Sequence, residues 1–454
     1  MKPSPVFLTD LLILRELFAP GEDFYLIDPA GRVQGEREDL PSPLRKSSDH
    51  DEQPSFVADL RNGEIVLYSS SCGDERWLSF DYINNPDGTI RWFYPSAGIH
   101  AGHLSLYNAV SVKAKLYKTL TRIAWKLGQH HRLASGTFRV QQKLYESVQM
   151  RYGITFREAA SFFTGTRGAT RKLVIELHNE EQTTGFIKVP LTTEAKHLTE
   201  NEYEMVKSLS RYDFTTLSLP KLSPRINGHA RLSNVKPAIV IPADRITNIH
   251  LAAMTELVHI SHETKRISET PVWEAIENNL HFLSNEVVFI NELSREKTAD
   301  LTALLQALCK HIDTNEHIAL SVSHGDFTPW NMYCDEQRLY VYDWEMARNG
   351  IPLFFDLFHF TYQTTILRQR RNYPAVKNQI DQWSQQPMAQ KLIQKHLVNL
   401  ALHQQLYLLF TASHYLRQYL GERELLMQSH WMIDAWTAAI RDALQTAKHD
   451  RKKI

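Results

Sequence analysis

The chain has 454 residues, which is long enough for two or three domains with a sizeable hydrophobic core. Its 51 Lys and Arg residues balance 51 Asp and Glu residues, and this zero formal net charge argues against nucleic acid as the main partner. Three scattered cysteines without the spacing of metal ligands indicate free thiols in a reducing compartment, so we expect a cytoplasmic protein. We find no apolar run of the length that a transmembrane helix needs.

The N-terminal part alternates strand-like runs with turn signals and carries no catalytic motif. It opens with an apolar stretch, Val6–Leu14, which Asp10 interrupts, and this predicts a short amphipathic helix and no signal peptide. Turn signals such as Asn62-Gly63 separate the runs that follow. We expect a small α+β module over residues 1–130, to which the sequence assigns no function. The predicted strands are Phe24–Ile27, Ile65–Tyr68, Trp77–Phe80 and Ile90–Tyr94.

A helix without Gly or Pro is predicted from Leu104 to Leu127. Its apolar residues recur every three or four positions and form one face, and its basic residues recur in the same way. Two interpretations stay open. The helix is either a core helix with a solvated basic face, or it contacts an anionic membrane or an anionic substrate. The apolar positions are Ala109, Val112, Leu116, Leu120, Ile123 and Leu127, and the basic positions are Lys115, Lys118, Arg122 and Lys126.

The middle of the chain predicts a β-hairpin followed by another strand. An apolar run leads into a turn that contains Gly165 and Gly168. Lys172–His178 and Phe186–Val189 then alternate between apolar and polar residues as strands do, and a polar turn separates them. Lys188 lies inside the second of these strands.

A predicted helix, Thr199–Leu209, comes next in the chain. Thr199 is placed to cap it and Glu202 stands at the third helical position, which is the spacing of a capping box. Glu204 lies two residues further along. The apolar run Pro237–Pro242 predicts a buried strand.

The most informative stretch is HGDFTPWN at residues 324–331, with the triplet Asp-Trp-Glu following at 343–345. Phosphoryl transfer needs a carboxylate to receive a hydroxyl proton and two oxygen ligands that hold Mg²⁺ on the phosphates. A short loop, followed by a predicted strand at Leu339–Tyr342 that delivers Asp343, supplies all three groups. Glu345 lies on the same face as Asp343 if this strand continues, which makes it a candidate ligand for a second metal ion.

The order and spacing of these two motifs resemble those of the aminoglycoside phosphotransferase and choline kinase family of small-molecule kinases. The resemblance implies that Asp326 orients the acceptor hydroxyl and accepts its proton. It implies that Asn331 and Asp343 hold Mg²⁺, that His324 orders the loop, and that Asp356 begins a helix that supports the loop. H-G-D in place of H-R-D and D-W-E in place of D-F-G exclude a protein kinase.

The same resemblance gives roles to the upstream residues. The hairpin turn with Gly165 and Gly168 would lie over the nucleotide. Lys188 would bind the α- and β-phosphates, and a Glu on the following helix would pair with it. Glu202 fits the family pattern best, and Glu204 is the other candidate.

Beyond residue 245 the pattern is mostly helical. The resemblance implies an α+β, bilobal, protein-kinase-like fold. We expect the module at residues 1–130, a β-rich nucleotide lobe with its linker at 131–244, and a helical lobe at 245–454. The predicted helices of the last part are Met254–Ile267, Val272–Leu283, Ala299–Ile312, Ala389–Leu420 and Trp431–Ala447.

The function that the resemblance implies is ATP- and Mg²⁺-dependent phosphorylation of a hydroxyl on a small molecule, such as an aminosugar, a sugar or polyol, or an amino alcohol. The loop form with Phe-Thr-Pro-Trp before Asn331 looks like that of bacterial phosphotransferases associated with surface polysaccharides. Two alternatives are a catalytically silent kinase fold that binds nucleotide or acts as a scaffold, and an unrelated protein in which the motif is accidental. The sequence leaves the acceptor and the oligomeric state open.

Overall fold

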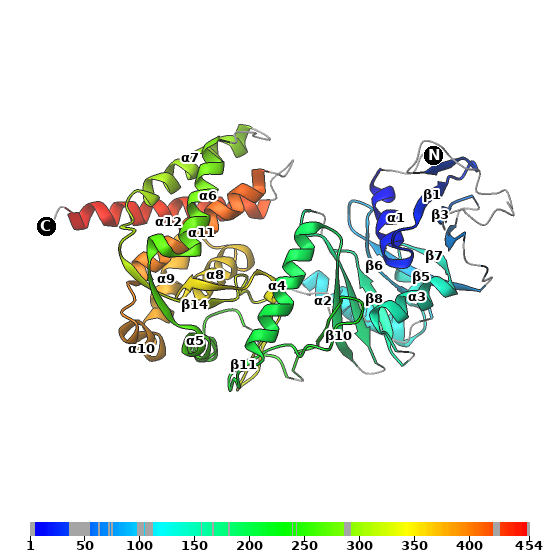
Figure 1. Cartoon of the computed structure of the whole chain (residues 1–454), viewed down its shortest axis with the longest axis horizontal. Coiled ribbons are helices and arrows are strands. Elements are labelled where there is room, and N and C mark those ends of the chain that lie inside the picture. The colour runs from blue at the N-terminus through cyan, green and yellow to red at the C-terminus, as the bar shows by residue number, and fades with distance from the viewer. Residues whose placement is uncertain are drawn as a thin grey trace. The chain divides into compact units, whose positions relative to one another are not determined.

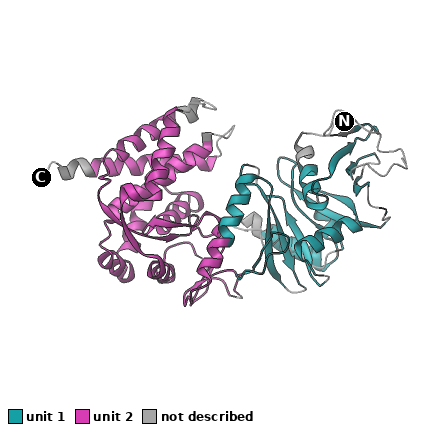
Figure 2. Ribbon diagram, in the orientation of Figure 1, with its two compact units in different colours: residues 1–203, 221–234 teal, residues 204–220, 235–454 magenta. Residues whose placement is uncertain are grey.

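The chain folds into two compact units, shown in Figure 2. Unit 1 comprises residues 1–203 and 221–234, and unit 2 comprises residues 204–220 and 235–454. The structure is a computed structural model. It describes residues 5–35, 55–61, 64–70, 73, 76–97, 104, 112–155, 157–165, 168–179, 182–237, 239–241, 243–285, 292–420 and 427–451.

Unit 1 is built on one large mixed sheet with the strand order β12-β10-β9-β8-β6-β5-β7-β4-β3-β1-β2 (Figure 1). Most neighbouring strands are antiparallel, and β1 pairs with β3, and β4 with β7, in parallel. The strands are β1 (Asp23–Ile27), β2 (Val33–Gly35), β3 (Ser55–Asp59), β4 (Ile65–Ser69), β5 (Trp77–Asn84), β6 (Ile90–Pro95), β7 (Gly136–Gln141), β8 (Ala159–Phe163), β9 (Lys172–His178), β10 (Thr183–Pro190) and β12 (Arg231–Ser233). The helices are α1 (Pro5–Phe18), α2 (Val112–Lys126), the 3₁₀ helix η2 (His130–Leu133) and α3 (Gln142–Tyr152), and α4 (Thr193–Leu209) begins in unit 1 and ends in unit 2.

One hydrophobic core joins the predicted N-terminal module to the predicted nucleotide lobe. Strand β6 pairs with β8, and the rings of Phe93 and Phe162 stack across this junction with centroids 4.7 Å apart. The core continues from α1 and α3 to the inner faces of β9 and β10. The expected boundary at residue 130 therefore does not separate two compact units, because β-sheet pairing and buried aromatic residues cross it. The expected boundary at residue 244 also differs, since residues 204–220 and 235–244 belong to unit 2.

Helix α2 turns its apolar stripe outward. Leu116, Leu120, Ile123 and Leu127 are between 48% and 69% exposed. The interpretation of this stripe as a core face is therefore wrong for these four residues. The part of the predicted helix at residues 105–111 and the side chain of Lys115 lie outside the described residues.

Unit 2 is mostly helical and contains two small sheets, with strand orders β11-β16-β15 and β13-β14-β17. An α+β fold with a β-rich part and a mostly helical C-terminal part was expected, and the structure confirms it. The strands are β11 (Leu217–Ser218), β13 (Glu263–Arg266), β14 (His317–Ser323), β15 (Met332–Cys334), β16 (Leu339–Val341) and β17 (Arg348–Pro352). The helices are α5 (Asn248–Ser261), η3 (Ile267–Glu269), α6 (Pro271–Asn285), α7 (Glu292–Cys309), η4 (Trp344–Met346), α8 (Phe355–Gln363), the π-helix η5 (Thr364–Arg368), α9 (Tyr373–Ser384), α10 (Pro387–Lys395), α11 (Leu400–Leu420) and α12 (Met427–Arg451).

Two local predictions in this unit were wrong. The predicted strand at Pro237–Pro242 is not formed over its described residues, and Ile239 is 74% exposed there. Only an isolated bridge from Ile241 to Cys334 is present. The helix predicted to run to Ile267 ends at Ser261, because Glu263–Arg266 pairs with β14 as a strand.

None of the helices that the structure describes combines the length and the hydropathy that a membrane span requires.

Candidate active site

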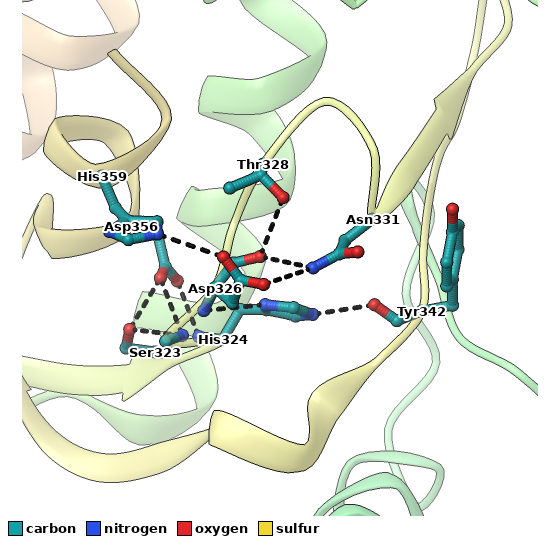
Figure 3. Close-up of polar contacts among 9 residues, drawn as sticks. Ser323, His324, Asp326, Thr328, Asn331, Tyr342, Asp356 and His359 are labelled. Atoms are coloured by element: carbon teal, nitrogen blue, oxygen red, sulfur yellow. Dashed lines mark hydrogen bonds and ion pairs between the residues drawn. The ribbon is translucent and has the colours of Figure 1, made fainter. Parts of the chain in front are cut away.

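The loop at residues 324–331 follows β14, and a buried carboxylate holds its first turn. Asp356, at the start of α8, is 1% exposed. Its Oδ1 accepts hydrogen bonds from the Ser323 hydroxyl at 2.7 Å and the Gly325 amide at 3.1 Å, and its Oδ2 accepts one from the His324 amide at 2.7 Å (Figure 3). Three donors on one carboxylate fix the direction in which the loop leaves the strand.

Gly325 and His324 set the conformation of this turn. Gly325 has a φ of 82°, and a Cβ there would lie 2.3 Å from the carbonyl oxygen of Met346, so only glycine fits. The His324 side chain is completely buried. Its Nε2–H donates to the Tyr342 carbonyl at 3.0 Å and its Nδ1 accepts from the Asp326 amide at 3.3 Å (Figure 3). Because a carbonyl can only accept and an amide can only donate, this pattern requires the neutral Nε2–H tautomer. His324 therefore links the loop to the backbone immediately after β16.

The Asp326 carboxylate is held at both oxygens and is 31% exposed. Asn331 Nδ2 donates to Oδ2 at 2.7 Å, and His359 Nε2 lies 3.2 Å from Oδ1 (Figure 3). Asn331 Nδ2 also donates to the Asp326 carbonyl at 3.0 Å. Since the amide nitrogen of Asn331 faces Asp326, its amide oxygen points the other way and is available to a cation.

Contrary to the expectation from the sequence, Asp343 does not lie on a strand that continues to Glu345. Strand β16 ends at Val341, Asp343 has a left-handed φ of 69°, and the 3₁₀ helix η4 follows. A left-handed conformation is costly for a residue other than glycine and is concentrated at functional sites. The assumption that placed Glu345 on the same strand face as Asp343 is therefore wrong. The turn nevertheless brings the two carboxylates within 4.8 Å of each other.

In unit 1, Lys188 on β10 forms an ion pair with Glu202 on α4. The Nζ and Oε2 atoms are 2.7 Å apart, and the side chains are only 11% and 2% exposed. Glu204, the other candidate partner of Lys188, has its Oε1 atom 3.6 Å from Nζ of Lys207. The helix begins at Thr193, six residues before the predicted cap. Thr192 Oγ1 accepts from the Ala195 amide in the manner of an N-cap.

The turn between β8 and β9 contains both glycines in left-handed or related conformations. Gly165 has a φ of 73°, and a Cβ there would lie 2.2 Å from the Lys172 carbonyl oxygen. Gly168 has a φ of 142° and open space at the Cβ position. Gly165 is therefore required by close approach of the backbone, and Gly168 by its backbone conformation alone.

Residues 264–385 match the family model described as phosphotransferase enzyme family. This segment is similar to that family, and the similarity covers about a quarter of the chain. The match confirms the resemblance that the two motifs suggested and supports the expectation of a phosphotransferase. It covers Asp326, Asn331 and Asp343 but not Lys188 or Glu202, whose assignment rests on their own geometry.

Three solved structures illustrate a weaker likeness. A glucosamine kinase is 13% identical, with 65% of this chain and 82% of that chain covered and a TM-score of 0.40. The ADP-bound aminoglycoside phosphotransferase APH(2'')-Ib is 12% identical, with 66% and 97% covered and a TM-score of 0.41. The GDP and kanamycin complex of APH(2")-IIia is 14% identical, with 68% and 98% covered and a TM-score of 0.40. TM-scores of this size support no conclusion about the present chain. No curated protein matches the chain significantly.

Two residues near Asp326 were not anticipated from the sequence. His359 follows Asp356 by one helical turn on α8, and its spacing from an Asp already assigned to loop support could have indicated it. Tyr415 comes from α11, and burial together with the negative charge of Asp326 raises its pKa. No sequence signal links α11 to the loop, because this electrostatic interaction depends on how the helices of unit 2 pack.

Proposed function

We propose that this protein is an ATP- and Mg²⁺-dependent phosphotransferase that phosphorylates a hydroxyl of a small molecule. The observation that carries the proposal is the arrangement around Asp326. Its carboxylate is oriented by His359 at one oxygen and by Asn331 at the other, and it remains accessible at 31% of its side-chain surface. A general base for phosphoryl transfer needs this combination of fixed orientation and access.

In the proposed reaction the acceptor hydroxyl binds to Asp326 and gives its proton to the carboxylate. The hydroxyl oxygen forms a bond to the γ-phosphorus, the bond from that phosphorus to the bridging oxygen breaks, and ADP leaves with the electron pair. The rate gain comes from positioning and from electrostatic stabilisation of charge on the transferring group. The Asp326 proton is then released to solvent.

The residues present fit a magnesium ion. The side-chain oxygens of Asp343 and Asn331 are hard ligands, and the bonds of Asn331 to Asp326 leave its amide oxygen available. Glu345 adds a carboxylate within 4.8 Å of Asp343 and remains a candidate ligand for a second ion. The ion supplies neutralisation of the negative charge on the phosphates.

Lys188 is proposed to bind the α- and β-phosphates of the nucleotide. Its pairing with Glu202 at 2.7 Å holds the ammonium in one place on β10. The turn that contains Gly165 and Gly168 connects strands of the same sheet, and we propose that it lies over the nucleotide. These upstream roles rest on the motif resemblance and on the geometry of unit 1.

The proposed acceptors are aminosugars, sugars or polyols, and amino alcohols. The form of the loop, with Phe-Thr-Pro-Trp before Asn331, supports a link to surface polysaccharide metabolism. The resemblance in this loop is the support for that link, and an acceptor screen with these compounds tests it.

The first experiment measures thermal stability with and without millimolar Mg·ATP. A ligand that binds only the folded state stabilises it by about 2–3 kcal/mol at a hundredfold excess over Kd. We expect an upward shift of the melting temperature for the wild type, and none for Asp343→Ala. Glu336→Gln, an exposed acidic residue between β15 and β16, serves as the matched control and should behave as the wild type.

Turnover is then tested with Asp326→Asn. This variant should keep the Mg·ATP shift and lose phosphorylation of every acceptor that the wild type accepts. A wild type that is stabilised by nucleotide but turns over no acceptor supports the silent kinase fold instead. A wild type that shows no nucleotide effect contradicts the proposal altogether.

A further inference from the structure

Helix α2 presents a narrow apolar stripe to solvent. Leu116 is 58% exposed, Leu120 52%, Ile123 48% and Leu127 69%. Because they are spaced by four, three and four residues, these side chains lie in one row along the helix. We call this row the α2 stripe. Isolated exposed apolar residues are ordinary, but four in register on one helix form a surface that water solvates poorly.

The opposite face of the helix is anchored, which fixes the direction of the stripe. Thr121 and Trp125, one turn apart, are 2% and 8% exposed. The Trp125 ring stacks on His130 with centroids 3.9 Å apart and contacts Tyr94 of β6 at 5.3 Å. His130 in turn hydrogen-bonds the Ser96 carbonyl at 2.9 Å through Nε2. The α2 stripe is therefore held outward by aromatic packing within unit 1.

A basic row runs beside the α2 stripe. Arg122 and Lys126, each one residue before a member of the stripe, are both exposed. No acidic residue lies nearby in the sequence. From residue 88 to residue 145 the chain has nine Lys or Arg and no Asp or Glu, although the whole chain has 51 of each class. The zero net charge of the whole chain hides this local excess of basic residues, which favours attraction of the segment to an anionic surface.

We propose that α2 docks unit 1 onto the surface of an anionic lipid bilayer. The helix lies parallel to the membrane plane, with the α2 stripe at the boundary between headgroups and acyl chains. Arg122 and Lys126 then lie at the level of the lipid phosphates. An apolar row flanked by basic residues on an otherwise anchored helix has the chemistry of an interfacial helix, for which apolar burial and attraction to anionic lipid act together.

A bilayer fits this surface better than a second copy of the chain or another folded protein. Two copies packed through the stripe would bring the basic rows of both helices together, and like charges repel. The stripe is also only about 17 Å long and one side chain wide, at 1.5 Å per residue. A stable protein interface needs roughly 800 Å² from each partner and a complementary shape. A fluid bilayer needs neither.

The test is sedimentation of the full-length protein with vesicles. One set contains phosphatidylcholine alone, and the other contains equal parts of phosphatidylcholine and phosphatidylglycerol. We expect the wild type to pellet with the anionic vesicles and not with the neutral ones, and the bound fraction to fall as salt rises. Leu120→Gln with Ile123→Gln, and separately Arg122→Gln with Lys126→Gln, should each lower the partition coefficient by about tenfold or more.

The matched controls lie on α3, in the same unit. Met150→Gln removes an apolar side chain that is 72% exposed, and Lys143→Gln removes an exposed charge. Both should bind vesicles as the wild type does. Circular dichroism of each variant checks that it is folded.

Four results would overturn the proposal. The first two are a wild type that does not pellet with anionic vesicles and a wild type that pellets equally with neutral ones. The third is vesicle binding by the α2 variants that equals that of the α3 controls. The fourth is a concentration-dependent dimer in analytical ultracentrifugation that the Leu120→Gln, Ile123→Gln variant abolishes, because such a dimer would assign the stripe to self-association. Activity toward soluble acceptors is measured in parallel, so that loss of vesicle binding can be separated from failure of the proposed kinase function.

Discussion

Replacing Asp356 by alanine tests whether a single buried carboxylate holds the loop that carries Asp326. The change removes the acceptor of three hydrogen bonds, one from a hydroxyl and two from backbone amides. The Gly325 amide also donates to Ser323 Oγ at 3.1 Å, and each of the other two donors costs about 1–3 kcal/mol when it is left buried without a partner. The losses are not additive because water can enter part of the space, so we expect a total of about 3–5 kcal/mol. Asp356→Asn keeps one acceptor oxygen and should lose roughly half as much.

The assay is thermal unfolding followed by circular dichroism. For a folding unit of 150–250 residues, 1 kcal/mol shifts the melting temperature by about 2–4 °C, so the alanine variant should melt roughly 6–20 °C lower. Asp381→Ala on α9 is the control, because Asp381 is exposed and on the same unit, and its shift should stay within about 2 °C. An Asp356→Ala variant as stable as this control would refute the argument that these hydrogen bonds hold the loop.

Three further predictions follow from the two units. Lys188→Met removes the cation that pairs with the buried Glu202 carboxylate, so it should destabilise unit 1 by about 3–5 kcal/mol and abolish the Mg·ATP shift. Glu204→Gln on the same helix should do neither. His359→Phe removes one hydrogen bond to the Asp326 carboxylate, the proposed general base, and should lower kcat by about tenfold or more with little change in the KM for nucleotide. His359→Gln should recover part of the loss, and an unchanged kcat would contradict this. Burial raises the pKa of Glu176 to about 8 from 4.5, so the folded state holds a proton that the unfolded state releases, and the stability of unit 1 should fall as the pH rises from about 4.5 to about 8. Glu176→Gln should flatten this dependence in melting curves between pH 5 and pH 9, and a slope equal to that of the wild type would exclude Glu176 as its source.

A candidate site could be proposed from the loop because its groups lie close together in the sequence. Residues 324–331 and 343 belong to one loop and one hairpin, so their order and spacing constrain where the side chains point. The strands at Lys172–His178 and Phe186–Val189 could be predicted for the same reason, since alternation is a local pattern. Gly165 was predicted as a turn residue, although only the structure gives the backbone contact that requires a glycine there.

Other features were decided by contacts between residues far apart in the sequence. The choice of Glu202 over Glu204 depends on which side of α4 faces β10, and the contact of His359 with Asp326 joins residues 33 positions apart. The joining of the N-terminal strands and the predicted nucleotide lobe into one sheet depends on the β6–β8 pairing, for which no local pattern exists. Each of these outcomes depends on packing between residues that are far apart in the sequence, and a short stretch of sequence cannot predict such packing.

Helix α2 shows where the division between sequence and structure lies. The sequence determined that a helix forms there, that one face is apolar and that a neighbouring row is basic, because these properties follow from helical periodicity alone. Whether the apolar face meets the protein or the solvent depends on which residues anchor the helix. Trp125 and Thr121 face the protein because the large Trp125 ring is buried where it stacks on His130 and packs against Tyr94, and the α2 stripe is therefore left exposed to solvent.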